Sequence, residues 1–451
     1  MSLQGQYKED DSRRFLLAVT VTFVLINTVL LIFSGPTKQL IEADSLTLYR
    51  MAMQFLKGGV FLEEQRQPLY PLVMAAVFWI FNPDNFTALI ILQAGLLYIT
   101  GVVIWYVARV WIPGAAHWIF ALTVLNPNAL GNVHMPLADS LFSVLITISV
   151  WCVLKFAISG KLRFIVTTGV ALGLAILTRP EAKFLIYILP LAAPVIAAVS
   201  GRIRQAPVAI LAALFAVVVV WLIALPWAMH NQSAGFGLVL NSGEKAADNA
   251  RGHFALIEAD RQQRKQQQII QDLYEQEKDL LDVAGLKNST VSQTRNFLFG
   301  HYISRIFTSD PVILFKLYSK AWVAQFVSGG AQTLNTVLGI DISTQDKLMN
   351  RNDWLRSFAD GLKGQSTVGA IITIVCIGFA LVLRAAGLVG IVVMVLRRHW
   401  PLLIVILALV GFKALIHLFY GLSRYRLPVE PLLMILAVYG FDGLRAALPR
   451  K

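Results

Sequence analysis

Runs of about twenty apolar residues recur along most of the chain, and a helix of that length crosses the hydrocarbon core of a bilayer. Hydrophobic residues make up 57% of the 451 and charged residues only 14%. Polar residues are therefore too few to cover the surface of a soluble core. We predict an all-α polytopic membrane protein with 10–12 membrane helices, and the runs lie at 15–33, 86–108, 115–133, 137–157, 163–178, 183–200, 206–228, 367–396, 401–420 and 429–446.

The basic residues predict the orientation, because Lys and Arg accumulate on the cytoplasmic side of a membrane. The run 68–82 is short, starts at a proline, and is expected to lie in the interface. With the N-terminus in the cytoplasm, both termini and five basic clusters then fall inside. These clusters are Arg109, Lys155/Lys161/Arg163, Arg202/Arg204, Arg397/Arg398 and Arg445/Arg450/Lys451. Arg384, in the middle of 367–396, could mark a break into two helices.

This topology predicts three parts. Residues 1–228 form an N-terminal membrane module whose first outer loop is 34–85, residues 229–366 an outer, mostly helical region, and residues 367–451 the last membrane helices. The stretch 255–283 alternates charged and apolar residues, as an amphipathic surface helix does. Such a helix either covers the membrane part or recognises an acceptor.

Several classes of function are disfavoured by what the sequence contains. The net charge is +13, but the cations cluster at the ends of apolar runs, so we expect membrane lipids and no nucleic acid as partners. Cys152 and Cys376 both lie inside apolar runs, which disfavours a disulfide or a metal pair. The sequence has no phosphate-binding G-x-x-x-x-G-K-[ST] loop and no H-E-x-x-H motif, which disfavours ATP-driven transport and protease-type zinc chemistry.

Acidic residues in the predicted outer turns are the first candidates for chemistry, since carboxylates beside a membrane are costly unless they are solvated or used. Glu42 and Asp44 lead into an amphipathic segment, and Asp139 begins a long apolar helix. Helix capping would explain either aspartate without a function. Cations share this face, and Arg suits phosphate oxygens, although any one of them could instead extend to lipid headgroups. They are Arg66, Arg179 beside Glu181, and Arg424 with Arg426.

The order of these motifs resembles that of the GT-C glycosyltransferases, in the bacterial branch of the protein O-mannosyltransferases and the lipid A aminoarabinose transferases. The resemblance covers about 40–445. It rests on Glu42-Ala-Asp44, Arg66-Gln-Pro-Leu-Tyr-Pro71, Pro127 with Asp139, Leu177-Thr-Arg-Pro-Glu181, Pro226-Trp-Ala-Met-His-Asn231 and Arg424-Tyr-Arg-Leu-Pro428. Gln67 stands directly before Pro68, where the family has a basic residue, so Arg66 matches less closely.

The resemblance implies transfer of one sugar from a polyprenyl-phosphate carrier to a hydroxyl of a lipid, polysaccharide or protein, with inversion. The reaction would take place on the extracytoplasmic face, most simply that of a bacterial inner membrane. Asp44 matches the catalytic aspartate, with Asp139 and Glu42 beside it. Donor-phosphate contacts would come from Arg66, Arg424, Arg426 and Tyr70, and further substrate contacts from His134, Arg179, Glu181 and Tyr425. We expect no obligatory cofactor, although Glu42, Asp44 and Asp139 could hold a divalent metal ion.

Other functions remain open from the sequence. A glycan ligase or oligosaccharyltransferase with a lipid-diphosphate donor would share the outer-face geometry. A lipid or glycolipid transporter would place ionisable residues near mid-membrane. Only Arg384, Lys413 and His417 depart from the general placement of charges near the ends of the apolar runs, which favours one-sided chemistry. A purely structural role would leave the arginine-rich turns unexplained.

Overall fold

The computed structural model describes residues 3–35, 43–59, 66–233, 237–240, 244–286, 289, 291–340, 362 and 364–447. Over these ranges the chain forms helices and no β-strand. Glu42, one of the predicted catalytic acids, lies outside the described residues. The helical class predicted from the apolar runs is confirmed.

Seven helical segments are long and apolar enough to cross a bilayer, so the chain is an integral membrane protein. They are α1 (Leu3–Ser34), α4 (Phe86–Trp111), α7 (Asp139–Ser159), α9 (Ala182–Val199), α10 (Ala206–Ser233), α17 (Thr367–Leu396), and the 3-10 helix η5 (Ser423–Val429) continued by α19 (Glu430–Ala447). Three further apolar helices are shorter, namely α3 (Leu69–Phe81), α8 (Leu162–Ile176) and α18 (Trp400–Ile416).

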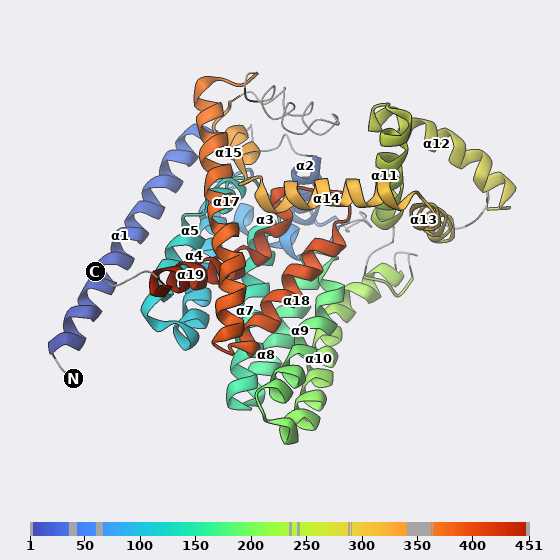
Figure 1. Cartoon of the computed structure of the whole chain (residues 1–451). Coiled ribbons are helices and arrows are strands. Elements are labelled where there is room, and N and C mark those ends of the chain that lie inside the picture. Colours follow the sequence, from blue (N-terminus) through green and yellow to red (C-terminus); the bar gives the residue numbers. More distant parts are fainter. Residues whose placement is uncertain are drawn as a thin grey trace.

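The remaining helices lie mostly around one end of this bundle. They are α2 (Ala43–Leu56), α5 (Ala116–Val124), α6 (Pro127–Val133), α11 (Glu244–Gln262), α12 (Gln266–Val283), α13 (Val291–Phe307), α14 (Pro311–Val327) and α15 (Ala331–Val337). In Figure 1, α11, α12 and α13 gather at the upper right, and α14 runs across the upper part of the molecule beside them. α1 runs along the left side of the bundle.

Packing inside the bundle relies on small residues where helices approach closely. α17 and α19 meet at Gly390 and Gly440. A Cβ atom at Gly390 would lie 1.9 Å from the carbonyl oxygen of Leu436, and one at Gly440 would lie 1.8 Å from that of Ala386. Glycine is therefore required at both positions for this backbone separation. Close packing matters here because lipid tails are as apolar as the helices, so burial of apolar surface does not hold the pair together.

The group α11–α13 has a hydrophobic core of its own, which includes Phe254, Ile269 and Leu298. A buried polar contact lies beside it, in which Arg251 Nη2 donates to Glu277 Oε2 at 3.0 Å. Tyr302 donates to the other oxygen of Glu277 at 2.6 Å. This part of the chain therefore packs as a coherent unit, and the division at residues 228 and 366 stays a prediction.

Two predicted helices are each divided in the structure. The run 115–133 forms α5 and α6, because Pro127 has no N–H to continue a helix and Asn126 caps α6 by accepting from the amide of Asn128 at 2.9 Å. The stretch 255–283 forms parts of α11 and α12, which are separated by a turn where Gln263 has a φ of 52°. The prediction of a single amphipathic helix over 255–283 was therefore wrong.

The possible break at Arg384 is also absent, because α17 runs continuously from Thr367 to Leu396. The charge of Arg384 is paired with Glu430 inside the bundle, so the helix does not need to open there. The interfacial segment predicted over 68–82 is the 13-residue α3. Its length of about 20 Å is less than the roughly 30 Å of a hydrocarbon core.

Candidate functional site

Asp44 in the first turn of α2 lies between two arginines from distant parts of the chain. Arg66 Nη2 donates to Asp44 Oδ1. Arg424 Nη2 donates to Asp44 Oδ2 at 2.9 Å. The Asp44 side chain is 29% exposed, and the two arginine side chains are 19% and 16% exposed. The group therefore borders solvent, and an incoming anion can reach it.

Backbone and amide hydrogen bonds hold the segment that carries Arg66 in place. The N–H of Leu69 donates to the carbonyl of Leu177 at 2.8 Å. The side chain of Gln67 donates to the carbonyl of Leu240 at 3.0 Å. The first contact joins the segment before α3 to the turn before α9, and the second joins it to the segment after α10, so Arg66 and Arg179 belong to neighbouring parts of one site.

A second group of charges is centred on Arg179 and Glu181. Arg179 Nη1 donates to Asp139, and its Nε lies 3.4 Å from Glu181 Oε1. Lys413 Nζ donates to the same Glu181 oxygen at 2.8 Å, and His417 Nε2 lies 3.3 Å from Oε2. Burial alone would raise the pKa of Glu181, but Arg179, Lys413 and His417 hold it well below its usual value. Glu181 is therefore ionised.

The two groups meet at Tyr425. Its ring stacks on His417, with a centroid distance of 4.0 Å and an interplanar angle of 6°. The guanidinium carbons of Arg424 and Arg179 lie 5.5 Å and 5.9 Å from the centroid of the same ring. Tyr425 therefore forms an aromatic wall between Asp44 with its arginines and the Asp139–Arg179 pair.

Arg426, two residues further on, is buried with a different set of partners. Its Nε donates to Glu430 Oε2 at 2.7 Å, and its Nη1 donates to the carbonyl of Gln325 near the end of α14. Glu430 also accepts from Arg384 at 2.6 Å and from Asn126 at 2.9 Å. The Arg426 side chain is only 1% exposed, so it stabilises η5 from inside the protein.

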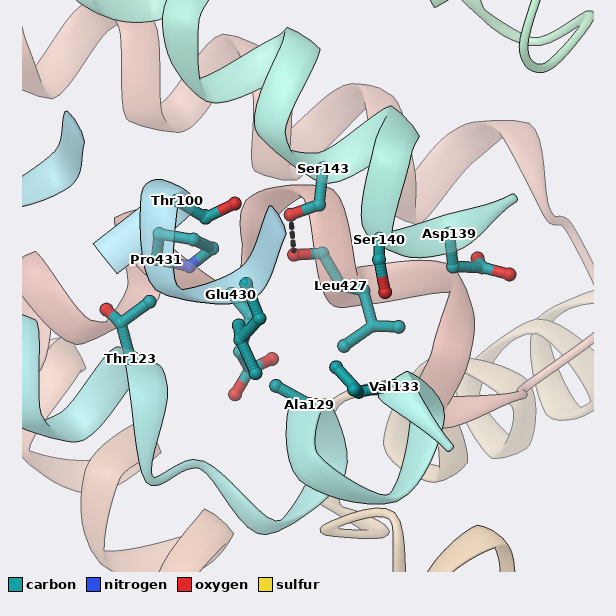
Figure 2. Close-up of a pocket in the computed structure, with 11 residues that line it drawn as sticks. Thr100, Thr123, Ala129, Val133, Asp139, Ser140, Ser143, Leu427, Glu430 and Pro431 are labelled. Atoms are coloured by element: carbon teal, nitrogen blue, oxygen red, sulfur yellow. Dashed lines mark hydrogen bonds between the residues drawn. The ribbon is translucent and has the colours of Figure 1, made fainter. Parts of the chain in front are cut away.

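Further hydrogen bonds hold η5, the segment that presents Arg424. Asn128 donates to the carbonyl of Ser423 at 3.1 Å, and Ser143 donates to that of Leu427 at 3.2 Å. Figure 2 shows the second of these bonds as a dashed line. These two bonds attach the segment to α6 and α7, and Arg426 attaches it to α14 and α19, so Arg424 is presented from a well-supported turn.

A small cavity lies behind this site. Asp139 and Glu430 both line it, and Figure 2 shows them on two sides of it, with Leu427 between them in this view. Its volume of about 20 Å³ has room for about one water molecule. A larger ligand would therefore have to bind on the more exposed side, where Asp44 is found.

Tyr70 and His134 lie deeper than the arginines around Asp44. Tyr70 donates to Gln93 Oε1 at 2.7 Å, and Gln93 in turn donates to the carbonyls of Val133 and Met135. His134 Nε2 lies 3.2 Å from Asn27 Oδ1, and burial lowers the pKa of His134 to about 4. Both side chains support the segment that leads to Asp139.

Four residues of these groups were not among the predicted site residues. They are Arg384, Lys413, His417 and Glu430. Three of them were visible as ionisable residues within apolar runs, and such residues usually mark a function or a buried partner. Glu430 carried a weaker signal, because it lies at the beginning of its run.

The described ionised side chains of the site carry a net positive charge. Among the residues that the structure describes, four carboxylates are paired with six cations, which leaves an excess of two positive charges within that set when His417 is neutral. The carboxylates are Asp44, Asp139, Glu181 and Glu430, and the cations are Arg66, Arg179, Arg384, Lys413, Arg424 and Arg426. In addition, Nε of Arg66 is buried and has no hydrogen-bond partner within the described ranges. An anion with several oxygen acceptors fits such a site.

Within the part of the chain that the structure describes, no three His, Cys, Asp or Glu side chains lie close enough together to hold a metal ion. Asp44 and Asp139 are each paired with arginine there. Glu42, the third residue of the suggested trio, is not among the described residues. The dependence on a divalent metal therefore stays a prediction.

Fold and site together define a helical integral membrane protein with a positively charged, arginine-rich site where α7, α9 and α19 begin and α8 and α18 end. No protein-family model matches the sequence, and no curated protein matches it. Among solved structures, the chain is similar to ArnT from Cupriavidus metallidurans in the apo state, with 16% identity over 93% of this chain and 77% of that one and a TM-score of 0.35. It is likewise similar to the same protein bound to undecaprenyl phosphate, with 16% identity, coverage of 94% and 77%, and a TM-score of 0.36.

Proposed function

We propose that the chain is a GT-C-type glycosyltransferase that moves one sugar from a polyprenyl-phosphate carrier to a hydroxyl acceptor, with inversion at the anomeric carbon. The observation that carries the proposal is the position of Asp44 between Arg66 and Arg424 on the exposed side of a positively charged site. The reaction needs a base for the acceptor hydroxyl and cations for the departing phosphate, and this arrangement offers both.

In the proposed reaction, Asp44 accepts the proton of the acceptor hydroxyl while the hydroxyl oxygen bonds to the anomeric carbon. The bond between that carbon and the phosphate oxygen breaks, and its electron pair stays with the phosphate. Arg66 and Arg424 stabilise the charge that the phosphate gains. A base of this kind contributes about 10²–10⁴-fold to the rate.

The second group of charges shapes the site around this reaction. We assign Asp139 and Arg179 to the orientation of the acceptor, with Tyr425 as a wall against which a sugar ring packs. Glu181 holds Arg179 in place through the contact described above. Arg426, Tyr70 and His134 support these residues from behind, since each is buried against protein partners.

The surroundings that we propose follow from the distribution of charge and from the nature of the donor. A lipid carrier requires the site to open at the membrane surface, and the distribution of the basic clusters favours the surface outside the cytoplasm. We therefore propose a bacterial inner membrane with the site facing the periplasm. The acceptor is a lipid, a polysaccharide or a protein, and a divalent metal ion is an optional addition.

The test uses purified protein in proteoliposomes with a panel of polyprenyl-monophosphate sugars and crude cell-envelope acceptors. We expect transfer from one donor and its loss, by at least about 100-fold, in Asp44→Asn. Asp84→Asn is a matched control, because Asp84 accepts from Tyr49 of α2 at 2.6 Å and has no role in the proposed reaction. Near-normal turnover by Asp44→Asn would exclude Asp44 as the base. No transfer from any monophosphate donor would contradict the proposal and favour a ligase that uses a lipid-diphosphate donor.

A further inference from the structure

The two arginines assigned to the donor phosphate are the same two that hold Asp44 in the structure. Arg66 uses Nη2 for Asp44 Oδ1, and Arg424 uses Nη2 for Asp44 Oδ2. A carboxylate paired with guanidinium groups keeps its charge more firmly and takes up a proton less readily. In this arrangement the base and the phosphate therefore compete for one pair of cations.

We propose that the donor phosphate displaces Asp44 from Arg66 and Arg424, so that donor binding is the step that releases the catalytic base. This inference rests on the function proposed above. Phosphate is well equipped to compete, because a guanidinium group binds its oxygens in a bidentate manner. In Arg66 only Nη2 is bonded to Asp44, whereas Nε has no hydrogen-bond partner within the described residues. Nε is therefore a further donor that a phosphate oxygen could use.

Exposure distinguishes this carboxylate from the other three in the site. The Asp44 side chain is 29% exposed, whereas those of Asp139, Glu181 and Glu430 are 5–10% exposed. Exchange of a partly exposed ion pair for another anion costs less than exchange of an enclosed pair, since water screens the exposed pair and can solvate the released carboxylate. The Asp139 and Glu430 pairs are enclosed by protein and are expected to persist.

The charges balance across the reaction. The donor is a phosphodiester with one negative charge, and the polyprenyl phosphate that leaves is a monoester with up to two. The proton taken from the acceptor neutralises Asp44, so the aspartate loses a charge as the phosphate gains one. Arg66 and Arg424 exchange Asp44 for the phosphate as their partner, and the number of ion pairs that they form stays constant.

The consequence is a substrate order and an unusual effect of one substitution. The acceptor hydroxyl can reach a free carboxylate only after the donor has bound, so the donor binds first. A neutral residue at position 44 no longer competes for the arginines. It therefore strengthens the binding of a carrier phosphate, whereas a residue that merely helped to bind the donor would weaken it when replaced.

The experiment measures the affinity of undecaprenyl phosphate for the purified full-length protein in nanodiscs. We expect Asp44→Asn to bind it about 2- to 30-fold more tightly than wild type, from the loss of two partly exposed pairs. Asp44→Ala provides a second uncharged variant if the first fails to fold, and Asp84→Asn should leave the affinity unchanged. In the background of Arg424→Gln the gain from Asp44→Asn should shrink, because one of the two shared cations is gone.

Unchanged or weaker binding by folded Asp44 variants would overturn the exchange. That result leaves the proposed function intact if transfer is also lost. Tighter binding together with normal transfer would instead support the exchange and refute Asp44 as the base, so the two proposals fail separately. Kinetics in which the acceptor binds productively before the donor would also overturn the inferred order.

Discussion

Asp44 and Arg424 are 380 residues apart in the sequence, and their side chains are joined by a hydrogen bond of 2.9 Å. The contact unites the first turn of α2 with η5, and Arg66 completes it from the segment directly before α3. The candidate site therefore forms only where the N-terminal and C-terminal parts of the chain pack together. Each side of that contact can be tested by substitution.

Arg424 and Arg426 provide a matched pair of substitutions, one expected to change carrier binding and the other to change stability. Arg424→Gln should weaken binding of a carrier phosphate by about 10- to 100-fold, because a charged hydrogen-bond donor to phosphate is worth about 1.5–3 kcal/mol. Arg426→Gln should instead lower the free energy of unfolding by about 1.5–3 kcal/mol, since it removes a buried charged hydrogen bond to Glu430, which keeps Arg384. Carrier binding and thermal unfolding in detergent separate the two. Loss of carrier binding by a fully stable Arg426→Gln would reverse the assignment.

Glu181 should be the residue on which the second group of charges depends. Glu181→Gln leaves Lys413, which is 1% exposed, without its carboxylate, and we expect a loss of about 3–5 kcal/mol in stability. Adding Lys413→Met should recover much of that loss, because no isolated buried ammonium group then remains. Lys413→Met alone should cost less than Glu181→Gln, since Glu181 keeps Arg179. Thermal unfolding of the three variants measures this, and additive losses in the double variant would contradict it.

The buried His253 of α11 predicts a pH dependence of stability. Burial, with a smaller effect of the nearby His417, lowers the pKa of His253 to about 4, against about 6.5 in an unfolded chain. Between these values the unfolded state binds more protons, so stability is full above pH 6.5 and falls as the pH drops toward 4. Unfolding measured from pH 7.5 to 4.5 should show this, and His253→Gln should reduce the slope. An unchanged slope in the variant would assign the effect to other groups.

Two glycines of α17 should respond differently to the same substitution. Gly390→Ala places a Cβ 1.9 Å from the Leu436 carbonyl oxygen and should force α17 and α19 apart, at a cost of about 1–3 kcal/mol or more. Gly378→Ala meets nothing within 4 Å and should be neutral or stabilising by up to about 1 kcal/mol. Thermal unfolding compares them. Equal effects would mean that helix propensity, rather than close packing, governs both positions.

Much of the fold was predictable because membrane helices are specified by local features. A run of apolar residues must form internal hydrogen bonds in a bilayer, and the helix is the form that satisfies them within one segment. The same local logic explains the errors. Asn126-Pro127 carried a helix-start signal inside an apolar run, and the continuous charge pattern across Gln263 concealed a turn. At both places the periodic pattern was given more weight than the local signals that interrupt a helix.

The candidate site was predictable as a set of residues on one face, but not as pairs. Arg424 and Arg426 lie in one short motif and read alike in the sequence. In the structure, Arg424 reaches Asp44 and Arg426 is enclosed with Glu430. The difference arises because η5 presents the two side chains to different surroundings, and no local pattern contains that information.

The sequence by itself determined that this chain is a helical membrane protein with its acidic and arginine-rich turns on one face, because helix formation and orientation depend on hydrophobicity and charge within each segment. Only the tertiary structure decided that Asp44 lies between Arg66 and Arg424 and that Glu181 recruits Lys413 and His417. Ion pairs form between whichever charges the packed helices bring within a few ångströms. Packing joins segments hundreds of residues apart, so these partners are set by the assembled bundle.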